Sequence, residues 1–280
     1  MDNYYRPASY SLLPPVIKWM LIINTAMFLI TLAAQQLGYE DVLINFLALH
    51  YFGSNLFFPH QLVTYAFMHG GWPHLLLNMF ALWMFGTMVE NTWGSKRFLI
   101  YYMFTAIGAG LTHWAFQYYE IAPLAHHVNA FIENPDPGDL RLLFDQNSAN
   151  LSTESIDQTE NLIASYKSEP KNPMYIKAAT DFASQLLALK SNSPVLGASG
   201  AVFGVLLAFG MLFPNMLIYI YFLFPVKAKY VVAAYGLMEI YYAVQNNPGD
   251  NVAHLAHLGG MLFGIILILL WRRRGSSRWG

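Results

Sequence analysis

The sequence predicts an all-α polytopic membrane protein with six transmembrane helices and an extracytoplasmic insert between the third and the fourth. Hydrophobic residues make up 56% of the 280 residues and charged residues only 11%, which is unlike a soluble domain. Apolar runs that approach the length needed to cross a bilayer recur along the chain. Between the third and fourth of these runs lies a stretch that holds most of the acidic residues.

The N-terminal part of the chain carries the first three spans. We expect a cytoplasmic tail over residues 1–14 and a membrane unit with a long outer first loop over 15–119. The aromatic residues of that loop indicate partial burial in the membrane interface. Within the unit, we expect spans over 15–34, 74–89 and 98–119, with the connection between the first two over 35–72.

The remaining sequence predicts an insert over 120–195, three further spans over 196–271 and a basic cytoplasmic tail over 272–280. Apolar residues recur at helical spacing in Glu160–Tyr166 and Met174–Lys190. We therefore expect a helical hairpin that lies over the membrane face. The three spans are expected over 196–213, 231–244 and 254–271.

The orientation of the spans follows from lysines and arginines, which favour the cytoplasmic side. Basic residues follow spans two, four and six, whereas the connections after spans one and five contain none. We therefore expect both termini in the cytoplasm and the insert outside. The formal net charge of −1 gives no reason to expect nucleic-acid binding, and the absence of cysteine excludes disulfides and thiolate metal sites.

With this orientation, the first turns of spans two, four and six meet at the outer leaflet. Span two begins with His74 and Asn78 on one helix face, span four with Ser199, and span six with His254 and His257. Polar side chains at membrane depth are costly and are usually functional. Their matching depth predicts a nucleophilic hydroxyl, an imidazole base and donors for an oxyanion.

Glycines near these residues predict close helix packing. The small-residue pairs Gly200 and Gly204 on span four and Gly260 and Gly264 on span six would let the two helices approach within reach of a Ser–His hydrogen bond. Gly197 precedes the serine.

Simpler interpretations stand beside the catalytic one. A glycine-flanked serine is more often a packing motif than a nucleophile, and one of the two histidines of span six is expected to be merely interfacial. Asn78 is also able to bridge helices. Glu239 is expected to hydrogen-bond another helix, and Glu90 to anchor the loop that follows it. The sequence holds no His-Glu-x-x-His metal signature.

Three motifs in this order and depth resemble the rhomboid intramembrane serine proteases, over the six spans but not the insert. They are His69-Gly70-Gly71-Trp72-Pro73-His74-Leu75-Leu76-Leu77-Asn78, Gly197-Ala198-Ser199-Gly200, and Ala256-His257-Leu258-Gly259-Gly260-x-x-x-Gly264.

The resemblance implies a six-helix rhomboid bundle with a catalytic dyad of Ser199 and His257 and no acidic third member. It implies oxyanion contacts from His74 and Asn78, and an aromatic residue, Phe203, stacked on the base. The implied activity is hydrolysis of transmembrane segments of other membrane proteins through an acyl-enzyme, with no cofactor or metal. A bacterial plasma membrane is the expected location.

Two features depart from the family pattern. Many relatives carry a Trp-Arg pair in the first outer loop, whereas no arginine lies between Gln35 and Trp72. The connection between spans three and four is also unusually long.

Two alternatives belong to other functional classes. A rhomboid-fold protein that binds membrane clients without cutting them would lose the dyad, and a small transporter would place polar residues at the midplane, often with repeat symmetry.

Overall fold

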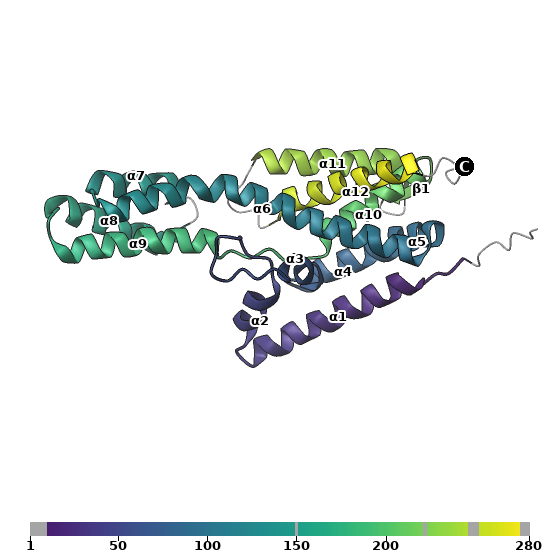
Figure 1. Ribbon diagram of the computed structural model, residues 1–280, viewed down its shortest axis with the longest axis horizontal. Helices are drawn as coiled ribbons and strands as arrows, with labels where there is room; N and C mark the ends of the chain where they lie inside the picture. Colours follow the sequence, from purple (N-terminus) through teal and green to yellow (C-terminus); the bar gives the residue numbers. More distant parts are fainter. Residues whose placement is uncertain (1–9, 149–150, 221–222, 246–251, 275–280) are drawn as a thin grey trace, which may run out of the picture.

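The computed structural model describes residues 10–148, 151–220, 223–245 and 252–274, which form a helical bundle with a helical arm projecting from it (Figure 1). In chain order the elements are α1 (Pro15–Gln36), α2 (Glu40–Leu47), α3 (Gln61–Thr64), η1 (Tyr65–Phe67), α4 (Trp72–Ala81), η2 (Leu82–Gly86), α5 (Thr87–Trp93), α6 (Ser95–Glu133), α7 (Pro137–Asn147), α8 (Thr153–Ser168), α9 (Pro173–Ser191), α10 (Ser199–Leu212), β1 (Leu217–Ile220), β2 (Phe224–Lys227), α11 (Ala228–Gln245) and α12 (His254–Arg274).

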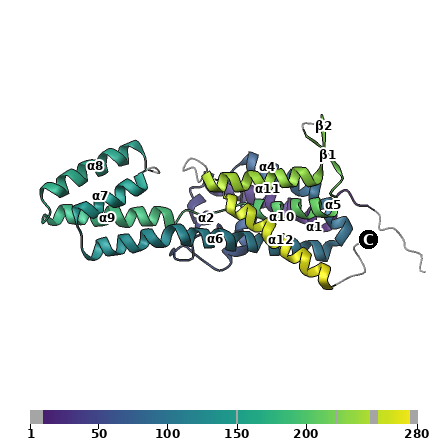
Figure 2. The same cartoon turned by 90° about the horizontal axis from the view of Figure 1, so that it is seen from above.

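Helix α10 is the enclosed centre of the bundle. It is apolar on every side, and almost all of its residues are buried. A helix of this kind needs partners all round, and α10 packs against α6, α11, α12 and the continuous helix formed by α4, η2 and α5. Figure 2 shows α10 beside α11 and α12 in a second view.

Glycines set the spacing of these helices, with one difference from expectation. A Cβ at Gly260 would collide with the carbonyl oxygen of Gly200, so α10 and α12 approach as closely as predicted. A Cβ on Gly204, however, would meet Thr105 of α6, and a Cβ on Gly200 would meet both Ala109 of α6 and the backbone of Ala256 in α12. The small residues of α10 therefore also allow α6 to pack closely against α10.

The continuous helix α4–η2–α5 contains a π-helical segment, η2, in its middle. Near its end, the buried carboxylate of Glu90 accepts hydrogen bonds from the backbone N–H groups of Val16 and Ile17 (2.9 Å each) and from Ser95 Oγ (2.6 Å). The first N–H groups of a helix lack intrahelical partners, and a negative charge there is favourable. Glu90 thus contacts the following loop, as expected, and also fixes the start of α1.

Helix α6 continues well past the expected end of the third span at residue 119. It has 39 residues, which correspond to a length of about 58 Å, and it includes Pro123. The expected boundary of the insert at residue 120 therefore falls inside a continuous helix. The apolar residues Leu124, Val128 and Phe131 explain the continuation, because they form one side of a second hydrophobic core with α7, α8 and α9.

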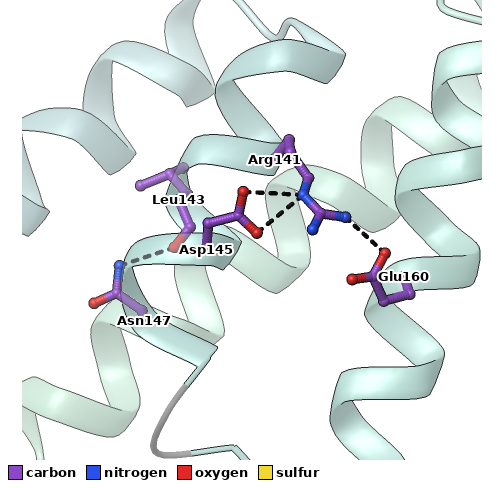
Figure 3. Close-up of polar contacts among 5 residues, drawn as sticks. All are labelled: Arg141, Leu143, Asp145, Asn147 and Glu160. Atoms are coloured by element: carbon purple, nitrogen blue, oxygen red, sulfur yellow. Dashed lines mark hydrogen bonds and ion pairs between the residues drawn. The ribbon is translucent and has the colours of Figure 1, made fainter.

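This second core makes the arm a small helical unit whose described core residues are all different from those of the bundle. Figure 3 shows Arg141 of α7 between two carboxylates, Asp145 at 2.9 Å and Glu160 of α8 at 2.7 Å, beside the hydrogen bond from Asn147 to the carbonyl of Leu143. These ion pairs are exposed and add little stability. The arm projects away from α10–α12 (Figure 1), and its position over the membrane face stays a prediction.

The structure is mostly helical, but it also contains a two-stranded hairpin. Strands β1 and β2 pair antiparallel, with Leu217 opposite Lys227 and Ile220 opposite Phe224. The expectation of an all-α fold missed this hairpin because its apolar sequence resembles the end of a span. The β-branched and aromatic residues of this segment favour strands, and a proline such as Pro225 is typical of an exposed edge strand.

Among the described helices, Pro15–Gln36 and His254–Arg273 are long and apolar enough to cross a membrane, while the apolar helix Ser199–Leu212 is shorter. Helix α1 exposes Trp19, Ile22, Leu29 and Ile30 on its outer surface. Exposed apolar side chains in such a row are unfavourable in water and suit contact with lipid.

Candidate functional site

Ser199 is the first residue of α10, and the segment before it is held on two sides. The backbone groups of Val195 and Leu49 exchange two hydrogen bonds of 2.8 Å, and the N–H of Gly197 donates to the carbonyl of Tyr65 at 2.9 Å. Gly197 has φ of 134°, which favours glycine, and a Cβ there would press into the ring of His74. The chain therefore turns sharply into α10 with Ser199 at the bend.

His257 lies opposite this serine, in the first turn of α12. Its Nε2 atom is 2.8 Å from Oγ of Ser199. The approach of Gly260 to Gly200, one turn deeper, makes this distance possible. His257 is buried, with a 7% exposed surface, and Ser199 is partly buried. The two residues expected to form a pair are thus within hydrogen-bond distance.

An aromatic residue covers the imidazole. The ring of Phe203 stacks on that of His257 with centroids 4.3 Å apart and an interplanar angle of 7°. Phe203 follows Ser199 by four residues, so it lies on the same face of α10. The stacking that the resemblance implied is present.

The structure also brings His74 to this end of the bundle, where its ring lies against Gly197. Asn78 is buried one turn further along α4, and one of its amide protons is donated to the carbonyl of His74 at 3.0 Å. Beside them, in the loop before α4, burial and the neighbouring His74 lower the pKa of His69 to about 4. Its imidazole is therefore neutral at pH 7.

The sequence interpretation kept Glu239 outside the site and expected one of the two histidines of span six to be merely interfacial, whereas the structure places Glu239 beside both histidines. Oε2 of Glu239, on α11, lies 2.6 Å from Nδ1 of His254 and 2.9 Å from Nδ1 of His257. The expectation that Glu239 bonds another helix is confirmed, because both partners lie on α12. His254 is not merely interfacial, because it has this carboxylate as a close partner. An ionisable residue within an apolar helix requires polar partners. The glutamate in the apolar sequence of span five was therefore a sign that Glu239 has such partners.

Among the described residues, these three side chains are close enough together to be considered as ligands of a metal ion. Each offers one possible ligand atom, and the three atoms lie within 4.8 Å of one another. Ligands of a tetrahedral zinc ion, each at about 2.0–2.2 Å from the metal, would be roughly 3.3 Å apart. The distances of 2.6 and 2.9 Å between oxygen and nitrogen are shorter and fit N–H···O contacts. The cluster therefore has the geometry of a hydrogen-bonded group.

Comparison with known families agrees with this geometry. A family model described as Rhomboid domain matches residues 57–124 and 174–274, more than half of the chain. The matched ranges include all the residues of the cluster. They leave out 125–173, which hold α7, α8 and the end of α6.

Several curated proteins are similar to parts of this chain. Rhomboid-like protein 11, chloroplastic, of Arabidopsis thaliana is 33% identical over 98 residues, which cover 35% of this chain and 32% of that protein. RHOMBOID-like protein 12, mitochondrial, of the same plant is 23% identical over 219 residues, covering 78% and 47%. Rhomboid protease GluP of Bacillus subtilis is 39% identical over 62 residues, covering 22% and 12%. The chain spans about half or less of the length of these relatives.

Proposed function

The chain belongs to the rhomboid family of membrane-embedded proteins, and we propose that it is an intramembrane serine endopeptidase. The observation that carries the proposal is the 2.8 Å distance between Ser199 Oγ and His257 Nε2, at the adjoining ends of two tightly packed helices. A serine hydroxyl is a weak nucleophile until a base takes its proton, and an imidazole at this distance is the usual base.

The proposed reaction has two steps. Ser199 attacks the carbonyl of the scissile peptide bond while His257 takes the hydroxyl proton, and His257 then donates that proton to the leaving amine. An acyl-enzyme remains. Water, activated by His257, hydrolyses it and restores Ser199. No cofactor takes part in the proposed reaction.

Donors for the oxyanion are available on two sides. Ser199 is the first residue of α10, and the N–H groups of a first helical turn lack intrahelical partners. We assign the second contribution to the ring of His74 and to the amide proton of Asn78 that its own helix does not use.

We further propose six spans, formed by α1, α4–α5, the first part of α6, α10, α11 and α12, with both termini in the cytoplasm and the arm outside. Two contacts support a common cytoplasmic end. Glu90 binds the start of α1, and the guanidinium of Arg97 lies 4.3 Å from the ring centroid of Trp271, near the end of α12. Ser199 and His257 lie at the opposite ends of their helices.

The proposed substrates are single transmembrane segments that small or helix-breaking residues allow to unwind near the outer face. The site lies at the first turns of three helices, near the proposed outer face, and a segment that unwinds at that depth would reach it most easily. We also propose that the protein lies in a bacterial plasma membrane, where lysines and arginines such as those after spans two, four and six favour the cytoplasmic side.

Labelling with a fluorophosphonate probe tests the proposal directly. We expect the purified protein in detergent to be labelled, and to cleave a transmembrane substrate in liposomes. Ser199→Ala should lose both activities while it keeps its thermal stability. If the folded wild-type protein is neither labelled nor active on a panel of transmembrane substrates, the protease proposal is wrong, and binding of membrane clients without cleavage becomes the better explanation.

A further inference from the structure

The carboxylate of Glu239 is buried beside the proposed base, with 8% of the residue exposed. It lies on α11, and in the described part of the chain its ion-pair partners are His254 and His257 of α12. A carboxylate among apolar helices is expensive unless nearby groups stabilise its charge. This arrangement therefore needs an explanation beyond the packing of α11 on α12.

The geometry constrains the proton on His257. For Nε2 to accept the proton of Ser199, the neutral imidazole must carry its own proton on Nδ1. Oε2 of Glu239 lies 2.9 Å from that Nδ1 atom and favours this tautomer. The contact is bent, since the oxygen lies off the direction of a ring N–H, and Nδ1 has no fully formed hydrogen bond.

His254 holds the carboxylate in place. Its Nδ1 lies 2.6 Å from the same Oε2 atom, and its ring stacks on Tyr242 of α11 with centroids 5.3 Å apart. Because both histidines extend from the first turn of α12, they fix Oε2 between them. The hydrogen bond from His254 also stabilises the negative charge.

We propose that Glu239 is a positioning residue that extends the Ser199–His257 pair to a Ser–His–Glu arrangement, with His254 orienting its carboxylate. This inference rests on the proposed protease function. In the acylation step, the O–H bond of Ser199 breaks, a bond forms between Oγ and the carbonyl carbon, and the proton moves to Nε2 of His257. Glu239 stays ionised throughout and stabilises the imidazolium that forms.

Glu239→Gln tests the role with little change in shape. Its amide N–H₂ is able to donate to Nδ1 of His257, which would place the proton on Nε2 and leave the base in the wrong tautomer. We expect kcat to fall by roughly 10- to 1,000-fold with KM nearly unchanged, less than the roughly 10⁴-fold loss known for a linear triad contact, because this contact is bent. Glu239→Asp retains the charge and should recover part of kcat.

The matched control is Glu133→Gln, which makes the same chemical change at an exposed position at the end of α6. It should leave kcat and KM at wild-type values. Thermal stability in detergent is measured for every variant. If Glu239→Gln does not fold, Glu239→Asp and His254→Gln provide the comparison, since each loosens the contact without leaving a buried neutral amide at position 239.

Solid-state nitrogen NMR of histidine-labelled protein gives a readout that packing alone would not change. The signals of His257 are assigned by their loss in His257→Ala. We expect Nδ1 protonated and Nε2 unprotonated in the wild type, and a second tautomer in Glu239→Gln. An unchanged tautomer together with unchanged kcat in Glu239→Gln would overturn the inference.

The same experiments separate this inference from the proposed function. If the wild type cleaves substrate and Glu239→Gln is equally fast, only the role of Glu239 is wrong. If the wild type shows no cleavage or labelling that depends on Ser199, the protease proposal fails, and the assignment of Glu239 to catalysis fails with it.

Discussion

Phe203 lies flat against His257, with the two ring centroids 4.3 Å apart and the ring planes inclined by only 7°. The stack covers one face of the imidazole, while Ser199 and Glu239 contact its two nitrogens. The orientation of the base is therefore fixed by three residues from two other helices, α10 and α11. None of these three residues alone would hold the ring at the angle needed for proton transfer.

Replacing Phe203 should show how much the stack contributes. Aromatic pairs contribute about 0.5–1.5 kcal/mol beyond the area they bury, so Phe203→Ala should lower kcat by roughly 2- to 10-fold. Phe203→Tyr should keep most of the activity, because it retains the ring. Phe203→Leu fills similar space without stacking and serves as the control. Cleavage by Phe203→Ala at the wild-type rate would contradict this account.

The lowered pKa of His69 predicts that the folded protein loses stability in acid. Its folded pKa of about 4 lies below the ordinary value of 6.5 because of burial and of His74, so the unfolded chain binds a proton that the folded chain does not. The contribution of His69 to the free energy of unfolding is fully present above pH 6.5 and is lost as the pH falls towards 4. The difference corresponds to roughly 3 kcal/mol.

Unfolding in detergent at pH 7.5 and pH 4.5 measures this effect. His69→Phe should reduce the acid-induced loss of stability, whereas replacement of the exposed His127 by glutamine should leave it as in the wild type. An equal acid-induced loss in His69→Phe and in the wild type would contradict the assignment to His69.

Local sequence patterns were enough to predict much of the site. Ser199, His257, His74 and Asn78 stand at the starts of apolar runs, where polar residues are conspicuous, and the structure brings these starts to one end of the bundle. Glu239 was misjudged because it lies in the middle of its span by sequence. Only the three-dimensional offset of α11 against α12 reveals that its carboxylate is level with the first turn of α12.

The errors in the fold have a similar cause. The end of α6 was placed near residue 119 because the following sequence is less apolar, yet Val128 and Phe131 are buried by partners from α7, α8 and α9 that lie far along the chain. Hydropathy along the sequence does not report such long-range contacts. The hairpin of β1 and β2 was missed because a short apolar run suits a strand and a helix equally well.

Gly260 is expected to be intolerant of even one added methyl group. The Cβ of Gly260→Ala would collide with the backbone of Gly200, where no flexible side chain is able to move away. We expect a loss of about 1–3 kcal/mol of stability, or more, and loss of cleavage as α12 moves away from α10. Gly236→Ala on α11 is the control, because its Cβ would meet Met261 at an ordinary 3.5 Å. Equal thermal stability of the two variants would show that the contact is not rigid.

The arm should be dispensable for the chemistry. Its core is separate from that of the bundle, so we propose replacing residues 122–190 by a Gly/Ser linker of about six residues, whose span of roughly 13 Å joins packed helices about 10 Å apart. Asn192 would keep its 2.6 Å hydrogen bond with Ser54. We expect unchanged fluorophosphonate labelling of Ser199. Loss of labelling in a folded protein would mean that the arm supports the site.

The two histidines of α12 should differ in how completely their loss stops cleavage. His257 contacts Ser199 directly, whereas His254 orients the carboxylate of Glu239. Ser199→Ala and His257→Ala should therefore each abolish cleavage of a transmembrane substrate. Their double variant should be no worse than either single variant, because the two residues act as a unit. His254→Ala should keep measurable activity, lowered in kcat by no more than Glu239→Gln.

Combining His254→Ala with Glu239→Gln gives the decisive comparison. Once the carboxylate is gone, the edge-to-face ring contact with His257 (centroids 6.2 Å apart) remains but does not set the tautomer, so the double variant should cleave at close to the rate of Glu239→Gln alone. Rates are measured in liposomes, and thermal stability confirms that each variant is folded. If His254→Ala is inactive and His257→Ala is active, both properly folded, then His254 is the base and the assignment made from the 2.8 Å contact between Ser199 and His257 is wrong.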